Sequence, residues 1–169
     1  GGLSGSGKST VAAALAPLVG AVPGARVLAS DRLRKRRFGV PVDRRLGPEA
    51  YRPEVSTAVY ADLRDEAAVV LAAGSAVIAD AVHARADERR AIAAVAEAAG
   101  APFLGAWLDV PPDRLKARVA ARRGDPSDAT VATVDAQLGY DLGEMAWTRL
   151  DASRPPADLA AGIAGRARA

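Results

Sequence analysis

Cysteine is absent from the 169-residue sequence, and aromatic residues make up only 4% of it. Without cysteine the chain can form no disulfide, no thiolate metal site and no cysteine nucleophile. One histidine, His83, cannot build a zinc site alone. No apolar run approaches the roughly 18–20 residues that cross a bilayer, and no segment resembles a signal peptide. We therefore expect a cytoplasmic protein without a membrane partner.

Lysine is also scarce, with three residues against 20 arginines. The net charge is only +3 although the isoelectric point is near 9.7. Arginine in place of lysine raises the isoelectric point without adding charge, and the 41 alanines agree with a GC-rich coding bias. A nucleic-acid partner is therefore not expected, and the alternative of a nucleic-acid-binding module predicts binding that weakens steeply with salt.

Short apolar runs alternate with helical patterns, which is typical of an α/β domain with a mostly parallel sheet. The runs are apolar throughout, as expected for strands covered on both faces, and span residues 26–30, 76–80, 103–110 and 146–151. Helices are predicted over residues 9–18, 54–73, 87–99, 113–123, 128–138 and 157–166. Asp128 is the predicted N-cap of its helix. Residues 32–53 are expected to be irregular or partly helical, and residues 1–169 to form a single domain.

Residues 2–9 match the phosphate-loop pattern GxxxxGK[ST] at every fixed position. Glycines let successive N–H groups point at a phosphate, and the following helix adds its positive end. We predict that ATP is bound by Gly2, Leu3, Ser4, Gly5, Ser6, Gly7, Lys8, Ser9 and Thr10. Lys8 would reach the β- and γ-phosphates, and the Ser9 hydroxyl would coordinate Mg²⁺.

A phosphate loop normally follows a central strand of the sheet, yet no strand precedes Gly1 in this sequence. We expect that strand to lie before Gly1 and the chain to be a segment of a longer protein. The alternative is a fold that lacks its first strand.

Two acids follow predicted strands and complete the candidate site. Asp80 ends the run 76–80, where it would hold Mg²⁺ directly or through water. Asp31 and Arg34 follow the run 26–30 in the pattern Asp-x-x-Arg, at an edge of the sheet that faces the phosphate loop. Asp31 could accept the proton of an attacking hydroxyl while Arg34 holds the substrate. A helix cap for Asp80 and a solvated basic turn around Arg34 are the alternatives.

Arginines are spaced by four along the predicted helix 113–123, so that Arg114, Arg118 and Arg122 share one stripe, with Arg123 beside it. Arginines on a mobile lid can neutralise charge on a transferred phosphoryl group and exclude water. We predict a lid over about residues 113–128, with Arg118 and Arg122 as catalytic residues. A solvated helix face is the alternative.

Several segments together resemble the P-loop kinase-type ATP-binding domain called AAA-33: GGLSGSGKST, SDRLRKRRFGV, AVIADAV, WLDV, RLKARVAARRGDPSDAT and WTRLD. The resemblance implies a three-layer αβα P-loop fold with a helical lid. Asp31 and Arg34 look like the Asp-x-x-Arg pair of polynucleotide and zeta-toxin-like kinases, in which the Asp is the base. Arg118 and Arg122 are similar to lid arginines of gluconate and shikimate kinases. Such domains are often fused behind an aminoglycoside-phosphotransferase-like domain, which implies a fused N-terminal domain here.

The sequence therefore predicts an ATP- and Mg²⁺-dependent kinase acting on a hydroxyl of a small-molecule acceptor, such as a sugar, a polyol or an antibiotic. Lys8, Asp31, Arg118 and Arg122 are its predicted catalytic residues. The segment 32–53 matches no better-known kinase closely enough to name the acceptor. Two alternatives remain: an ATP-binding regulatory module of a fused phosphotransferase, and a kinase of polynucleotide 5′-hydroxyl groups.

Overall fold

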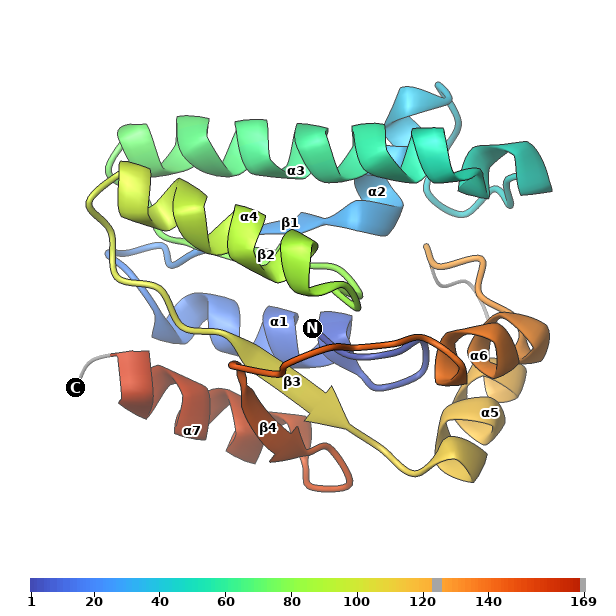
Figure 1. Cartoon of the computed structure of the whole chain (residues 1–169). Helices are drawn as coiled ribbons and strands as arrows, with labels where there is room; N and C mark the ends of the chain where they lie inside the picture. The colour runs from blue at the N-terminus through green and yellow to red at the C-terminus, as the bar shows by residue number, and fades with distance from the viewer. Residues whose placement is uncertain (123–125, 168–169) are drawn as a thin grey trace.

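The computed structural model describes residues 1–122 and 126–167. Four short strands and seven α-helices alternate along these residues (Figure 1). The strands are β1 (Arg26–Ala29), β2 (Val77–Asp80), β3 (Ala106–Asp109) and β4 (Thr148–Asp151). The helices are α1 (Lys8–Leu15), α2 (Ser30–Arg37), α3 (Pro53–Ala72), α4 (Ala86–Ala98), α5 (Pro112–Ala121), α6 (Val131–Leu138) and α7 (Pro156–Ala167), with 3-10 turns η1 (Ala16–Leu18) and η2 (Pro48–Tyr51).

Helix boundaries follow local chemistry at most places. Pro53, Pro112 and Pro156 each start a helix, where the missing N–H costs nothing. Gly74 follows α3 with a φ of 76°, a left-handed conformation that glycine adopts without strain. The segment 32–53 is partly helical as predicted, because α2 takes up its first residues and η2 its end.

Helices cover the strands from two sides, which gives three layers (Figure 1). Val77 and Ala79 of β2 pack into one apolar cluster with Leu63 and its neighbours on α3 and α4. Ile78 faces the opposite way, into a second cluster built by α1 and α7. This alternation along one strand is what a sheet buried on both faces requires. The prediction of an α/β fold with parallel strands and helices on both faces is confirmed.

The strands form two separate parallel pairs, β1 with β2 and β3 with β4. An apolar cavity of about 660 Å³ lies between the pairs and is lined by β2, β3 and the inner faces of α1, α3 and α4. Gly1 and Gly2 lie beside it: the Gly1 nitrogen donates to the Ala106 carbonyl at 2.7 Å, the Leu108 amide donates to the Gly1 carbonyl at 2.9 Å, and the Gly2 amide donates to the Val82 carbonyl at 3.1 Å. The opening glycines therefore bridge the two pairs.

The predicted lid, about residues 113–128, contains α5, which packs on α6 through Leu115, Val119 and Val134. We call α5 and α6 together the lid helices. Leu3 of the phosphate loop packs against this cluster. Arg123 and the other residues of the segment 123–125 lie outside the described part of the chain. No helix within residues 1–122 and 126–167 is both long and apolar enough to pass through a membrane.

Candidate functional site

The phosphate loop predicted from residues 2–9 folds as a tight turn between Gly1 and α1. Gly2, Gly5 and Gly7 have φ values of 138°, 87° and 91°, which other residues rarely adopt. A Cβ on Gly5 would lie 2.6 Å from the Leu115 carbonyl oxygen of α5, so space as well as backbone conformation requires glycine there. The loop therefore lies close against the lid, and α1 begins at Lys8.

Polar groups of the loop suit a bound phosphate. The Lys8 ammonium group donates to the Leu3 carbonyl at 3.1 Å, so the side chain folds back over the loop. The Ser6 hydroxyl is buried and has no hydrogen-bond partner among the described residues, which is costly unless a ligand supplies one. Ser9 and Thr10 are exposed on the first turn of α1, whose positive end favours an anion.

The lid helices hold the loop from outside. The Ser4 amide donates to the Gln137 side-chain oxygen of α6 at 2.8 Å, and both residues are buried. The Arg118 guanidinium donates to the carbonyls of Gly5 and Ser6, at 3.4 Å each, and to the Ala152 carbonyl at 3.1 Å. Arg118 therefore braces the loop backbone in this structure.

Gln137 is a site residue that the sequence analysis missed. A signal was present, because Gln137 lies three residues after buried Val134 and so shares the inward face of its helix. A polar residue on a buried face needs a hydrogen-bond partner, but its partner lies 133 residues away in the sequence.

Asp31 and Asp80 reach the same place from neighbouring strands. Asp80 ends β2 and pairs in register with Ala29, two residues before Asp31, which lies in the first turn of α2. Burial raises the pKa of Asp31, and the nearby Asp80 charge raises it further. A hydrogen bond from Ser127 and the positive charges of Lys8 and Arg34 oppose this rise. Lys8 and Asp80 thus lie within electrostatic range of the Asp31 carboxylate.

A magnesium ion could be held here by Ser9 and Asp80. Mg²⁺ prefers oxygen ligands and keeps several waters, so one hydroxyl, one carboxylate and the phosphates of a nucleotide are a chemically suitable set. Among residues 1–122 and 126–167, no group of three His, Cys, Asp or Glu side chains could hold a metal by itself.

Arg34 lies deeper than the sequence suggested. Its side chain is 6% exposed, donates to the Ala50 carbonyl at 2.5 Å and reaches the Ser56 hydroxyl at 3.4 Å. Its guanidinium carbon lies 4.8 Å from the centre of the Tyr51 ring, while its Nε has no hydrogen-bond partner among the described residues. Arg34 thus supports the wall of the site, and its predicted role in holding substrate stays a prediction.

His83 follows Asp80 by three residues and adopts a left-handed φ of 51°. Its ring is wedged between Tyr60 and Trp147, with ring centres 5.4 and 5.2 Å away. Both ring nitrogens are buried and have no hydrogen-bond partner within the described residues. Burial, followed by the positive charges of Lys8 and Arg89, lowers the pKa of His83 to about 3. His83 is therefore a neutral packing residue at neutral pH.

Asp128 is not the cap of α6 that the sequence predicted. Thr130 caps that helix by accepting from the Thr133 amide at 3.3 Å, and α6 begins only at Val131. Asp128 instead binds Lys35 of α2, with 2.8 Å between Nζ and Oδ1. Local sequence favoured the cap because acids are common there, whereas the ion pair depends on a residue 93 positions away.

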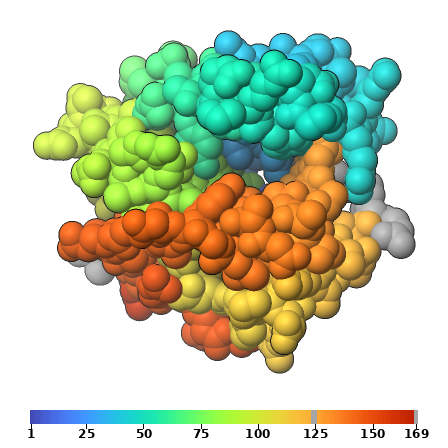
Figure 2. Space-filling view, turned by 45° about the vertical axis from the view of Figure 1, so that its right-hand side comes forward, coloured from blue at the N-terminus to red at the C-terminus, as the bar shows by residue number. Residues whose placement is uncertain are grey.

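The lid faces the start of α3 across a hollow in the surface. Figure 2 shows this hollow between the turquoise start of α3 and the orange α6, with blue atoms of the N-terminal part at its bottom. Lys8, which follows the glycines of the phosphate loop, and Asp80 lie within electrostatic range of Asp31. The arrangement can hold a polyphosphate at the loop and a second molecule beside Asp31.

Residues 1–140 match AAA_33, described as an AAA domain. The chain belongs to the AAA_33 family. No curated protein sequence matches this AAA_33 domain.

Solved structures give its fold relatives. The domain is 23% identical to a sugar kinase from Janibacter sp. HTCC2649, with a TM-score of 0.63, 98% of this chain and 94% of that one covered. It is 24% identical to a gluconokinase from Sinorhizobium meliloti 1021, with a TM-score of 0.61 and coverage of 99% and 89%. It is 23% identical to the Mycobacterium tuberculosis APS kinase in complex with AMPPNP and APS, with a TM-score of 0.65 and coverage of 99% and 94%. The AAA_33 domain thus has the fold of P-loop kinases.

The arginines predicted along the lid helix occupy different positions in this AAA_33 domain. Arg122 follows the last residue of α5, and Arg114 lies exposed in its first half. Arg118 donates to the phosphate-loop carbonyls of Gly5 and Ser6. The catalytic roles of Arg118 and Arg122 remain predictions.

Proposed function

We propose that this AAA_33 domain is a kinase that transfers the γ-phosphate of ATP to a hydroxyl of a small molecule. The observation that carries the proposal is the meeting of Lys8, Asp31 and Asp80 beside the glycine loop at the ends of β1 and β2. A protein that only sensed ATP would need the loop and its lysine but not a half-buried carboxylate facing the second molecule. The names of the fold relatives, a sugar kinase and a gluconokinase, direct the search for an acceptor toward sugars and sugar acids.

In the proposed reaction the loop amides and Lys8 bind and orient the phosphates. Asp31 takes the proton of the acceptor hydroxyl while the acceptor oxygen bonds to the γ-phosphorus. The bond between the γ-phosphorus and the β-phosphate oxygen breaks, and ADP is released. The raised pKa of Asp31 makes its carboxylate a stronger base than an exposed aspartate. Ser9 and Asp80 would hold Mg²⁺, which when bound neutralises charge on the phosphates. Lid arginines, Arg118 and Arg122, would stabilise charge on the transferred group.

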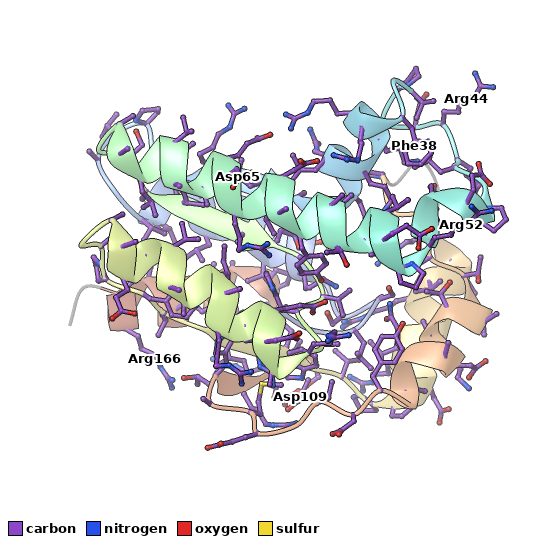
Figure 3. All side chains as sticks on the ribbon, turned by 45° about the horizontal axis from the view of Figure 1, so that its top comes forward. Phe38, Arg44, Arg52, Asp65, Asp109 and Arg166 are labelled. Atoms are coloured by element: carbon purple, nitrogen blue, oxygen red, sulfur yellow. The ribbon has the colours of Figure 1, made fainter. Side chains whose placement is uncertain are left out.

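The test follows label from γ-labelled ATP into sugars, sugar acids, polyols, aminoglycosides and 5′-hydroxyl oligonucleotides. Asp31→Asn removes the base but keeps the shape, so we expect transfer to fall at least about 1,000-fold while the Kd for ATP stays within about threefold. The matched control is Asp65→Asn, the same substitution at an exposed position on α3 (Figure 3), which we expect to leave both unchanged.

Three outcomes would contradict the proposal. Equal loss of transfer and ATP affinity in Asp31→Asn would contradict the role of Asp31 as the catalytic base. Transfer to the oligonucleotides alone would replace the small-molecule acceptor with a polynucleotide. ATP binding without transfer to any compound of the panel would favour a regulatory module.

A further inference from the structure

Residues 126–130, just before α6, form the stem of the lid. The stem is bonded to residues 30–51, which include α2 and η2 and which we call the acceptor-side segment. The tie is Asp128. Its Oδ1 accepts from the Lys35 ammonium group at 2.8 Å, and its Oδ2 accepts from the Tyr51 hydroxyl at 2.7 Å and the Leu46 amide at 3.0 Å. One carboxylate thus binds three groups of the acceptor-side segment. Figure 3 labels Phe38 and Arg44 of this segment at one end of the molecule.

This contact is buried and well satisfied. The side chains of Lys35 and Asp128 are 1% and 7% exposed, and Lys35 donates in addition to the Arg44 carbonyl. A buried ion pair repays its loss of water only when its geometry is good and its remaining polar atoms are bonded. Both conditions are met here, so the pair fixes where the lid stem lies relative to α2. By contrast, the ion pair between Lys116 and Asp135 of the lid helices, at 2.6 Å, lies at the surface.

The residue next to this tie contacts the proposed base. The side chain of Ser127 makes a hydrogen bond with the Asp31 carboxylate. The Asp31 carboxylate also lies within electrostatic range of three charged side chains, those of Lys8 from α1, Asp80 from β2 and Arg34 from α2. The hydroxyls of Tyr51 and Tyr60 lie within the same range. Ser127 supplies the hydrogen bond that comes from the lid side of the site, and a carboxylate held by such a bond has a defined orientation.

We propose that Ser127 is a positioning residue for Asp31, and that Asp128 holds Ser127 there by anchoring the lid stem to the acceptor-side segment. This inference rests on the proposed function. Ser127 and Asp128 act as a unit, because a stem that has lost its contact with Lys35 no longer places the Ser127 hydroxyl against Asp31. The phosphate loop is held separately, through Gln137 and Arg118. Loss of the unit therefore affects the acceptor and spares ATP.

The experiment compares Asp128→Asn with Asp135→Asn, the same substitution in the exposed pair of the lid helices. The first readout is hydrogen exchange of the Leu46 amide, which reports the tie whether or not the protein transfers phosphate. The second is kinetics with the acceptor that the labelling experiment identifies, in wild type, Ser127→Ala, Asp128→Asn and the double variant. Ser127→Thr tests rescue by another hydroxyl. If Asp128→Asn does not fold, Tyr51→Phe removes one hydrogen bond to the same carboxylate and keeps the ring.

We expect Asp128→Asn to speed exchange at Leu46 about tenfold or more and to lower kcat/KM for the acceptor about 10- to 100-fold, with the Kd for ATP within about twofold. Ser127→Ala should lower kcat/KM without changing exchange at Leu46, Ser127→Thr should recover most of it, and the double variant should lose no more than Asp128→Asn alone. Asp135→Asn should match wild type. Exchange and acceptor kinetics of Asp128→Asn equal to those of Asp135→Asn would overturn the inference, as would additive losses in the double variant. If wild type phosphorylates nothing, the proposed function fails, and exchange at Leu46 alone still decides whether Asp128 anchors the stem.

Discussion

Burial acts in opposite directions on two titratable side chains near the phosphate loop. It raises the pKa of Asp31 and lowers that of His83 to about 3, because weakly polar surroundings disfavour the charged form of each. For Asp31 the result is a carboxylate that binds a proton more strongly than an exposed aspartate, as the proposed base requires. For His83 the result is a stability that depends on pH.

We predict that replacing His83 makes the protein less sensitive to acid. The unfolded chain binds a proton at His83 near pH 6.5 and the folded chain near pH 3, so stability is full above pH 6.5 and is lost as the pH falls through this window. His83→Asn removes this loss, and asparagine tolerates a left-handed φ. Urea unfolding at pH 7 and pH 5 should show wild type losing about 2 kcal/mol more than the variant. The opposite pH dependence of Asp31 is common to both proteins and cancels in the difference. Equal losses in the two proteins would mean that the imidazole is protonated in the folded state.

Among the elements, the phosphate loop has little room for a larger side chain at Gly5. Gly5 lies against the backbone of α5, whereas a Cβ on Gly162 of α7 would meet nothing within 4 Å. The two glycines therefore form a matched pair for alanine substitution.

We predict that these two substitutions change the free energy of unfolding in opposite directions. Gly5→Ala forces a Cβ into a left-handed residue 2.6 Å from the Leu115 carbonyl oxygen, so it should cost about 2 kcal/mol or more and weaken ATP binding. Gly162→Ala should add up to about 1 kcal/mol, because alanine favours a helix interior. Urea unfolding gives the first comparison and ATP titration the second. A Gly5→Ala protein as stable as wild type would show that the loop can move away from α5.

Local pattern predicted the elements well and their contacts poorly. Each predicted strand and helix exists, with ends moved by a few residues, because apolar periodicity and Pro or Gly boundaries are local signals. The glycine loop was equally legible because its residues are consecutive. The roles of Gln137 and Asp128 were not, since each depends on a partner about 90 or more residues away that no periodicity reports. Helix starts and loop chemistry can be read from sequence; long-range polar pairs need the fold.

At the scale of the whole molecule, the two strand pairs and the cavity between them form one incomplete layer. β2 bonds to β1 along one edge and β3 bonds to β4 along one edge, and the cavity lies between β2 and β3. Gly1 makes to β3 the pair of backbone hydrogen bonds that a parallel strand would make. The strand expected before Gly1 stays a prediction, and the cavity has the place and the apolar lining to receive it.

We predict that an apolar strand joined to Gly1 stabilises the protein. A version carrying four or five residues such as Val and Ile before Gly1 would match the four-residue lengths of β2 and β3. It would bury apolar surface at about 25 cal/mol per Å², so we expect a gain of several kcal/mol and a higher Tm. The control carries the same number of residues with Lys and Asp in place of half of them. Equal Tm values for the two extended versions would contradict the prediction, because only burial distinguishes them.

The hydrogen bond between Gln137 and the Ser4 amide has a consequence for how two ligands would influence each other. It connects α6 to the phosphate loop, while the stem that leads into α6 is tied to α2 through Asp128. A ligand that displaces α6 as a whole from either end changes the free energy of binding at the other, whereas a local change in the stem that leaves α6 in place does not. Thermodynamic linkage then requires reciprocity: whatever factor a bound nucleotide applies to the affinity for the second molecule, that molecule applies to the affinity for the nucleotide.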